Sequence, residues 1–371
     1  MNSGLGSPVH VTAIGDVSLN GHYEKYFQQK GREYPCKTLL PRWSKSDLLI
    51  GNLESPITNG QRFAPAKCTL RGAKQTVDFL RTTNFAAVTL ANNHTMDYGP
   101  RGLLDTIDQL SAANMNFVGA GKDAVSASEL LILERADQTI GLLNYCDVEQ
   151  TSLLYASDSN EGVNELVVEK CVNEITAARS EVDWLIVNLH WGMEMTQIPS
   201  PQQRATARRF VEAGADLILG HHPHVLQPME RIEGVPVFYS LGNFLFSDMY
   251  WKGKKQNGQL FASRLRLHPL SRLTGWAEVE FCKGRETKAN FFPARLKRDL
   301  SVVADHRSSR VRQWKAMSKR LLASDYQTEW DREVKLADAR TAWRWAWKPL
   351  LRRVEMRLYW RGWLPNVVEG T

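Results

Sequence analysis

Short apolar runs recur along residues 9–247, and each run ends in a tight polar cluster. The six runs cover residues 11–14, 47–50, 86–90, 184–189, 216–219 and 235–240. The stretches with a helical pattern between them cover residues 73–82, 100–113, 165–180 and 201–213. Continuous apolar strands that alternate with helices are typical of an α/β sheet covered on both faces. In such sheets, functional groups gather at the carboxyl ends of the strands.

The pattern changes after the last of these runs. The polar, glycine-rich residues 252–259 predict a surface loop. Residues 260–267 and 276–281 alternate between apolar and polar positions and predict antiparallel strands. Residues 307–364 predict a largely helical segment, kinked at Pro349, in which apolar and basic residues recur at helical spacing. We therefore expect an α/β body followed by a helical C-terminal tail.

The composition is that of a globular protein. Of the 371 residues, 43% are hydrophobic and 23% are charged, and no apolar run approaches the roughly 18 to 20 residues that a membrane span needs. The first ten residues lack the basic start and the apolar core of a secretory signal. The five cysteines are odd in number and widely spaced. They argue against a disulfide scaffold and favour reduced thiols in the cytoplasm.

Positive charge is concentrated near the C-terminus. Residues 301–371 hold 15 Lys and Arg against 8 Asp and Glu, together with 7 of the 12 Trp, whereas residues 1–300 are neutral. We therefore divide the chain into a body, residues 1–300, and a basic, Trp-rich tail, residues 301–371. A basic helix with Trp suits an anionic membrane surface or a membrane-bound synthase, which would make the protein cytoplasmic but peripheral to the inner membrane. Packing of the Trp side chains on the body or on a second subunit is the alternative.

Nucleic acid is not an expected partner, because the body is neutral and carries no recognised binding motif.

The ends of the apolar runs carry a set of side chains suited to binding metal. The set consists of Asp16, Glu54, Asn93, His94, His190, His222 and His224. Imidazole, carboxylate and amide donors without thiolates suit zinc, manganese or iron. In extended backbone, His222 and His224 project to one side, roughly 6 to 7 Å apart. That spacing serves two metals about 3.5 to 4 Å apart, with Glu54 as a bridge. His94 points elsewhere, as a general acid or an oxyanion stabiliser.

Each of these residues also has an ordinary structural interpretation. A Gly-Asp pair after a strand is typical of a turn with an Asx hydrogen bond. A single histidine such as His190 is often a half-buried, hydrogen-bonded side chain, and Glu54 alone suits a helix N-terminus. Three imidazoles, two carboxylates and one amide at successive strand ends favour the metal site over these alternatives.

The polar clusters occur as six strings in a fixed order. They are Gly15-Asp16-Val17, Asn52-Leu53-Glu54, Ala91-Asn92-Asn93-His94 with Asp97 and Gly99, His190-Trp191-Gly192-Met193-Glu194, Gly220-His221-His222-Pro223-His224-Val225 and Tyr239-Ser240-Leu241-Gly242-Asn243-Phe244. As a set they resemble the CapA family of capsule and poly-γ-glutamate biosynthesis proteins, over about residues 9–247. That family is similar to a branch of the calcineurin-like metallophosphoesterases. The resemblance implies a four-layer α/β fold, with two packed β-sheets flanked by helices, and a two-metal rim.

The resemblance also implies a role for each residue of the set. Asp16 and His224 bind the first metal, Glu54 bridges, Asn93, His190 and His222 bind the second metal, and His94 is the acid beside the leaving group. Two departures from the wider phosphoesterase pattern concern the first metal. Ser18 stands where an Asp-x-His pattern has histidine, and Glu54 stands where an aspartate is usual. The first metal site is therefore expected to be one ligand short.

The implied function is capsule or poly-γ-glutamate-type polymer biosynthesis. It includes a hydrolase site with two divalent ions, manganese, zinc or iron, that acts on an anionic polymer, a peptide or a phosphoester. One alternative is a peptide epimerase that abstracts an α-proton, since a lasso-peptide epimerase also resembles this family. The other is a non-catalytic assembly factor, docked by its tail to a membrane polymer synthase.

Four residues near the strings are assigned to the surroundings of the site. Arg71 and Lys67 are candidates for binding an anionic substrate, although ordinary solvated cations are the equal alternative. Glu194 is a candidate for touching substrate. His221 is expected to lie behind the ligands or at the surface, because the flanking string already supplies two histidines.

Overall fold

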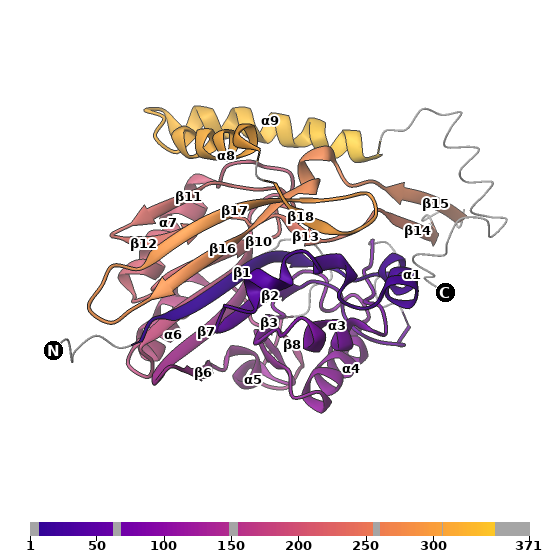
Figure 1. The fold of residues 1–371 in the computed structure, drawn as a ribbon, viewed down its shortest axis with the longest axis horizontal. Helices are drawn as coiled ribbons and strands as arrows, with labels where there is room; N and C mark the ends of the chain where they lie inside the picture. Colours follow the sequence, from indigo (N-terminus) through magenta and orange to yellow (C-terminus); the bar gives the residue numbers. More distant parts are fainter. Residues whose placement is uncertain (1–6, 62–67, 148–154, 255–259, 306, 346–371) are drawn as a thin grey trace.

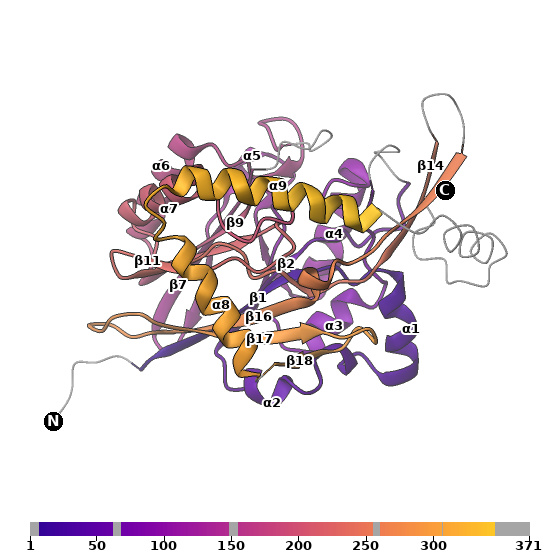
Figure 2. The ribbon, with the colours of Figure 1, turned by 90° about the horizontal axis from the view of Figure 1, so that it is seen from above.

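The computed structural model describes residues 7–61, 68–147, 155–254, 260–305 and 307–345. Two β-sheets pack against each other, and helices cover their outer faces (Figure 1). The two C-terminal helices lie across the strands at one side of the molecule, as the view from above in Figure 2 shows.

The first sheet has eight strands. Its order is β18 (Val302–Ala304), β17 (Lys288–Leu296), β16 (Leu273–Phe281), β1 (Val9–Val17), β2 (Leu48–Leu53), β3 (Ala87–Thr89) and β4 (Asn116–Val118), with β13 (Asn243–Leu245) paired to the end of β1. Strands β1 to β4 are parallel, whereas β16 to β18 run antiparallel to their neighbours. The first three predicted runs therefore lie side by side in one half of this sheet.

The second sheet has six strands. Its order is β11 (Met229–Ile232), β12 (Val235–Phe238), β10 (Leu217–His221), β9 (Trp184–Trp191), β7 (Gln138–Asp147) and β6 (Leu131–Arg135). The four inner strands are parallel, and the two edge strands are antiparallel. The last three predicted runs lie in this sheet.

Alternation along the strands explains why the two sheets pack together. Val11 and Ala13 of β1 enter the core between the sheets, where they meet Ile186 of β9 and Leu219 of β10. Ile14 points the other way, into the core under the helices of the first sheet. Because successive side chains of a strand face opposite sides, each apolar run supplies two cores.

Helices form the two outer layers. On the first sheet lie α1 (Gly21–Lys30), α3 (Thr76–Thr82) and α4 (Gly99–Ala112), and on the second lie α6 (Val168–Arg179) and α7 (Pro201–Glu212). The start of α7 is fixed by a capping box, in which Ser200 and Gln203 each bond the other's backbone N–H. The layer order of helix, sheet, sheet and helix confirms the predicted four-layer fold.

The remaining short elements connect these layers. They are η1 (Tyr34–Cys36), α2 (Leu40–Trp43), β5 (Ala120–Gly121), α5 (Ala124–Ser128), β8 (Gly162–Val163) and η2 (Pro269–Arg272).

The prediction of a surface loop over residues 252–259 is wrong for its first three residues. Residues 252–254 belong to β14 (Met249–Lys254), which pairs antiparallel with β15 (Leu260–Leu265). A two-stranded ribbon is held by backbone hydrogen bonds, so a polar sequence does not prevent it. The rest of the expected loop, residues 255–259, lies outside the described residues. The predicted antiparallel strands after it are confirmed, as β15 and β16.

The described part of the tail contains strand β18, which pairs with β17, and two helices that pack on the body. The two helices are α8 (Ser308–Arg320) and α9 (Tyr326–Trp345). Trp314 of α8 stacks on Phe291 of β17, with ring centroids 4.4 Å apart. Ala337 of α9 is buried against Met195. The helix predicted over 307–364 is thus interrupted after α8, and its part beyond residue 345 lies outside the described residues.

A buried carboxylate joins α9 to the loop that follows β9. Glu333 is fully buried and pairs with Arg320 at 2.7 Å and with Arg340. It also accepts a hydrogen bond from the backbone N–H of Gln197 at 2.8 Å. Arg340 in turn donates to the carbonyl oxygen of Met195 at 2.7 Å. A buried charge with several partners is costly to disturb, so these contacts fix the position of α9.

Within the described ranges, no helix is long and apolar enough to cross a membrane. The division into body and tail, the cytoplasmic location and the contact of the tail with a membrane or synthase stay predictions.

Candidate metal centre

Strand ends from both sheets meet at one buried site. Asp16 is the last residue but one of β1, and Glu54 directly follows β2. From the second sheet, His190 is the last residue but one of β9, and His222 directly follows β10. Parallel strands end at the same edge of a sheet, so the order of the strands brings these distant segments together.

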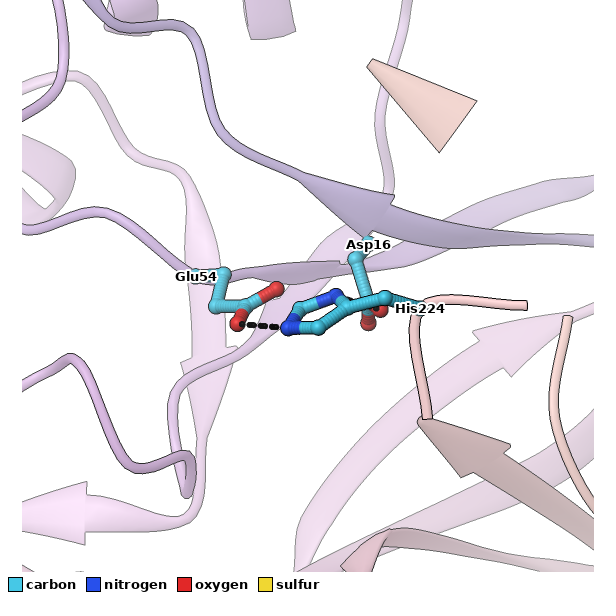
Figure 3. Close-up of side chains that lie close together, drawn as sticks. All are labelled: Asp16, Glu54 and His224. Atoms are coloured by element: carbon cyan, nitrogen blue, oxygen red, sulfur yellow. Dashed lines mark ion pairs between the residues drawn. The ribbon is translucent and has the colours of Figure 1, made fainter. Parts of the chain in front are cut away.

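Three side chains form the first ligand group (Figure 3). One donor atom from each of Asp16, Glu54 and His224 lies within 4.8 Å of the other two. The His224 ring sits between the two carboxylates, with Nε2 3.5 Å from Glu54 Oε1 and Nδ1 3.4 Å from Asp16 Oδ2. All three side chains are buried. These are the residues that the family resemblance assigns to the first metal and the bridge.

A second ligand group adjoins the first. His190 Nε2 lies 3.0 Å from the amide oxygen of Asn93, and the rings of His190 and His222 have centroids 4.9 Å apart. The ring of His222 is in turn 5.8 Å from that of His224. The six predicted ligands therefore lie in two adjoining groups.

The spacing argument assumed an extended backbone at His222 and His224, and the structure contradicts this assumption. His222 and His224 both have positive φ angles, 97° and 57°. Residues other than glycine rarely adopt such angles, and they cost of order 1 to 3 kcal/mol each. The turn that follows β10 imposes them, and the two rings still converge on the site. Strain held at a functional site is a recurring feature of binding centres.

The two histidines of the second ligand group are in the neutral state that binding of a cation requires. Burial lowers the pKa of His222 to about 4 and that of His190 well below its usual value, so both rings are neutral at neutral pH. Only a neutral imidazole has a free nitrogen for a metal. Burial also acts to lower the pKa of His224, but Glu54 and Asp16 outweigh it and raise that pKa to about 9. At neutral pH His224 is therefore protonated, and a cation bound beside the two carboxylates would have to displace that proton.

The donor set fits a borderline divalent cation. His222 Nδ1 is buried and has no hydrogen-bond partner among the described residues. Although burial raises the pKa of Asp16, His221 and His224 bring it well below its usual value, so the carboxylate is charged. A buried polar atom without a partner is costly unless it binds something. Imidazoles, carboxylates and one amide oxygen are ligands of zinc, manganese and iron.

His94 lies beside the ligands with its ring held from behind. Its Nδ1 is 2.7 Å from Asp97 Oδ2, and its Nε2 is 3.9 Å from Glu54 Oε1. Asn92 shapes the loop, because its side-chain oxygen accepts the backbone N–H groups of His94 and Thr95. The carboxylate can only accept, so Nδ1 carries a proton and Nε2 faces the site. This arrangement suits a proton donor.

Two asparagines that carried no predicted role hold the ligands. Asn243 Oδ1 lies 2.8 Å from His224 Nδ1 and fixes the ring so that Nε2 faces Glu54. The side chain of Asn52 donates to Asp16 Oδ1 at 2.9 Å. Both residues belong to strings that resemble the CapA family, and that position was the available signal.

His221 is buried, not at the surface. Its Nδ1 lies 3.2 Å from Asp16 Oδ1, and it is paired in register with His190 across β9 and β10. Neighbours in register share a face of the sheet, which explains why the His221 ring reaches the site.

The ligand groups open into a cavity of about 930 Å³. It is lined by His94, His222 and His224, by Glu194, by Ser200, Gln202, Gln203 and Thr206 around the start of α7, and by Trp330, Asp338, Thr341 and Arg344 of α9, among others. This volume is within the range of ligand sites, and its lining combines apolar and polar groups.

The predicted substrate contacts fall in different places. Glu194 lines the cavity and pairs with Arg344. Burial raises the pKa of Glu194, but the charge of Arg344 brings it to about 2, so Glu194 is ionised. Arg71 donates to the carbonyl oxygen of Gly60 at 2.7 Å and lies over the ring of Tyr98, and it is not among the described residues that line the cavity.

Lys67 lies outside the described residues. In the sequence, Arg344 is one of the basic residues of the tail helix, which are expected to meet an anionic membrane or to stay in water, and no motif marks it as part of a site; the structure buries it.

Comparison with known proteins identifies the class. The family described as bacterial capsule synthesis protein PGA_cap matches residues 10–248, more than half of the chain. The chain therefore belongs to this family of capsule synthesis proteins, and the resemblance to CapA is confirmed.

Two curated relatives are named for the same process. PGA biosynthesis protein CapA of Bacillus subtilis is 36% identical over 241 residues, which cover 64% of this chain and 63% of that protein. Capsule biosynthesis protein CapA of Bacillus anthracis is 32% identical over 256 residues, which cover 67% of this chain and 62% of that protein. The match thus spans less than two thirds of each relative's length.

Among solved structures, a novel phosphatase of Mycoplasma pneumoniae superposes with a TM-score of 0.49 at 14% identity, covering 83% of this chain and 98% of that one. Because this score is below 0.5, the fold rests on the strand order and layers described above, and the family rests on the sequence match.

Proposed function

We propose that this protein is a divalent-metal-dependent hydrolase that serves the synthesis of an anionic, capsule-type polymer. The observation that carries the proposal is the pair of adjoining ligand groups at the inner end of a cavity of about 930 Å³. Membership of the capsule synthesis family supports the biological setting. The names of the Bacillus relatives support poly-γ-glutamate or a similar chain as the substrate class.

Two cations would be held by the two ligand groups. Asp16 and His224 would hold one, Asn93, His190 and His222 the other, and Glu54 would lie between them. Bound there, divalent cations lower the pKa of water and polarise the bond to be cleaved. His221 and Asn52, both against Asp16 Oδ1, would orient that carboxylate toward its cation.

His94 would move the proton. Its Nε2 faces the ligand groups and would give a proton to the leaving group, while Nδ1 stays bonded to Asp97. The Asp97 carboxylate would stabilise the ring in its charged form, and it is itself fixed by the backbone N–H of Leu70 at 2.6 Å. The cavity would exclude bulk water from these groups when a polymer segment fills it.

The test begins with metal content, measured by mass spectrometry on protein purified without chelators. We expect about two transition-metal ions per chain, and their loss in the double variant His222→Ala/His224→Ala. The His94→Ala variant is the matched control, because it should keep the metals while turnover of phosphoester or γ-glutamyl substrates falls about 10²- to 10⁴-fold.

Three outcomes would contradict the proposal. Protein without bound metal would remove its basis. Deuterium at a substrate α-carbon in heavy water, without bond cleavage, would indicate an epimerase. Full function of His94→Ala in polymer synthesis, with loss of function on deletion of residues 301–371, would indicate an assembly factor.

A further inference from the structure

Helix α9 forms one wall of the cavity, and it lies outside the part of the chain that matches the family. Helix α9 begins at Tyr326, well beyond residue 248, where the match ends. It contacts both α7 and β15. Figure 2 shows it running across the molecule above α7 and β9. The candidate ligands at one end of the cavity thus lie within the matched range, whereas one wall comes from a helix that the match does not include.

Arg344 is the positive group of that wall. It is only 5% exposed, although arginine is seldom buried without a purpose or a partner. One of its five donors is bonded to Glu194, and its Nε has no hydrogen-bond partner among the described residues. Glu194 lies three residues after the end of β9, so the ion pair joins α9 to the loop that follows the strand of the candidate ligand His190.

No other described residue that lines the cavity is a lysine or an arginine. The lining also contains three carboxylic side chains, which would repel an anion: Asp147, Glu194 and Asp338. Beyond the cations, an acidic substrate could therefore pair only with those donors of Arg344 that Glu194 leaves unused, such as Nε, among the lysines and arginines of the described lining. A guanidinium binds carboxylates well, because its planar fork matches their geometry.

The part of the cavity lining around the start of α7 suits an amide backbone. The residues around the start of α7 that line the cavity carry hydroxyl and carboxamide groups, at Ser200, Gln202, Gln203 and Thr206. The oxygens of Ser200 and Gln203 already accept backbone N–H groups in the capping box, but Gln203 Nε2 has no hydrogen-bond partner among the described residues and could donate to an amide carbonyl. A lining that combines hydroxyl and carboxamide groups with a guanidinium favours a chain that carries both amides and carboxylates.

We propose that Arg344 is a specificity-determining residue, which binds a carboxylate of an acidic polyamide while a neighbouring bond lies at the metal centre. This inference deepens the proposed function and rests on it, because it names the residue that would recognise the acidic groups of the substrate in that same cavity. A phosphoester without carboxylates would use the centre but not Arg344.

The experiment measures binding by calorimetry with the metal-loaded full chain. The probes are a γ-linked glutamate pentamer and its uncharged counterpart, a γ-linked glutamine pentamer. We expect the wild type to prefer the acidic pentamer, and Arg344→Met to weaken its binding about tenfold or more while the glutamine pentamer binds as before. Arg332→Ala, at an exposed position of the same helix, is the matched control and should behave as the wild type.

Metal content, measured on every variant, separates this inference from the proposed function. Arg344→Met that keeps its metals and still prefers the acidic pentamer would overturn the role of Arg344. Wild type that ignores both pentamers but hydrolyses bis(p-nitrophenyl) phosphate would overturn the polyamide while leaving the hydrolase intact. A clear preference for the acidic pentamer in protein that binds no metal would overturn the hydrolase and leave Arg344 standing.

Arg344→Lys guards against a folding defect in the methionine variant. Lysine keeps the charge beside Glu194 but lacks the planar fork. We expect it to bind the acidic pentamer less tightly than the wild type and more tightly than Arg344→Met. Binding equal to that of the wild type in a variant with full metal content would count against bidentate recognition.

Discussion

The metal centre and helix α9 face the same cavity, but different forces hold them in place. The ligands lie at strand ends, and the strands are fixed by continuous apolar cores between and outside the two sheets. Helix α9 buries little apolar surface of its own, with Ala337 against Met195, and is fastened by the ion pairs of Glu333 and Arg344. The proposed reaction chemistry and the proposed substrate choice thus belong to separate parts of the chain.

The largest expected effect breaks the attachment of α9. In Glu333→Gln, Arg320 and Arg340 lose their shared buried carboxylate, and we expect a cost of about 3 kcal/mol or more. Urea unfolding would measure the loss, and limited proteolysis would show cleavage around α8 and α9. Asp331→Asn, at an exposed position of α9, is the control and should lose under about 0.5 kcal/mol.

Metal content gives the informative comparison for that variant. If the two regions are held independently, Glu333→Gln keeps its metals while its tail becomes accessible to protease. Loss of metal together with exposure of α9 would show that the two regions form one cooperative unit.

The next effect acts on the centre alone. Asn243→Ala removes the oxygen that orients His224, and we expect metal affinity to fall about 10- to 100-fold. Titration of the apoprotein with zinc or manganese would measure this change. Resistance of α9 to protease should stay that of the wild type, and a tail that opened in this variant would contradict the separation.

The smallest effect falls on the wall between the two regions. Ser200 is the N-cap of α7 and also lines the cavity. Because Ser200→Ala removes the capping oxygen, we expect the free energy of unfolding to fall by about 1 kcal/mol. Ser200→Asn restores a capping oxygen and should recover most of it. Thermal unfolding of both variants would measure the difference. An equal loss of stability in both variants would contradict the capping role of Ser200.

The parts of the protein with a local signal could be predicted from the sequence. Apolar runs that end in polar clusters gave the positions of β1, β2, β9 and β10, and the order of the strings gave the family and the four layers. The candidate ligands could be named because each lies within the last two residues of a strand or no more than four residues after one.

Strand β7, an inner strand of the second sheet, was not predicted, and the turn before it explains why. The hairpin of β6 and β7 turns at Ala136 and Asp137, which both have positive φ angles, 49° and 59°. A turn of this kind usually carries Asn-Gly or Asp-Gly, and neither occurs there. The apolar residues of β7 therefore had no turn signal beside them.

Contacts between distant segments had no sequence signal at all. Arg344 and Glu194 are 150 positions apart, and nothing in the pattern of a basic tail says which arginine is buried. The burial of His221 likewise depends on the register of β10 against β9, which the sequence of one strand does not determine.

The pairing of β1 has a consequence for how the protein is made. One edge of β1 pairs along its length with β16, so that Val9 faces Phe281. At about 5 to 20 residues per second, a ribosome needs more than ten seconds to deliver that partner after β1 has been synthesised. An unpaired, apolar strand edge invites aggregation during this time. Chains that end near residue 248, at the limit of the family match, keep that edge open permanently and should accumulate as insoluble protein.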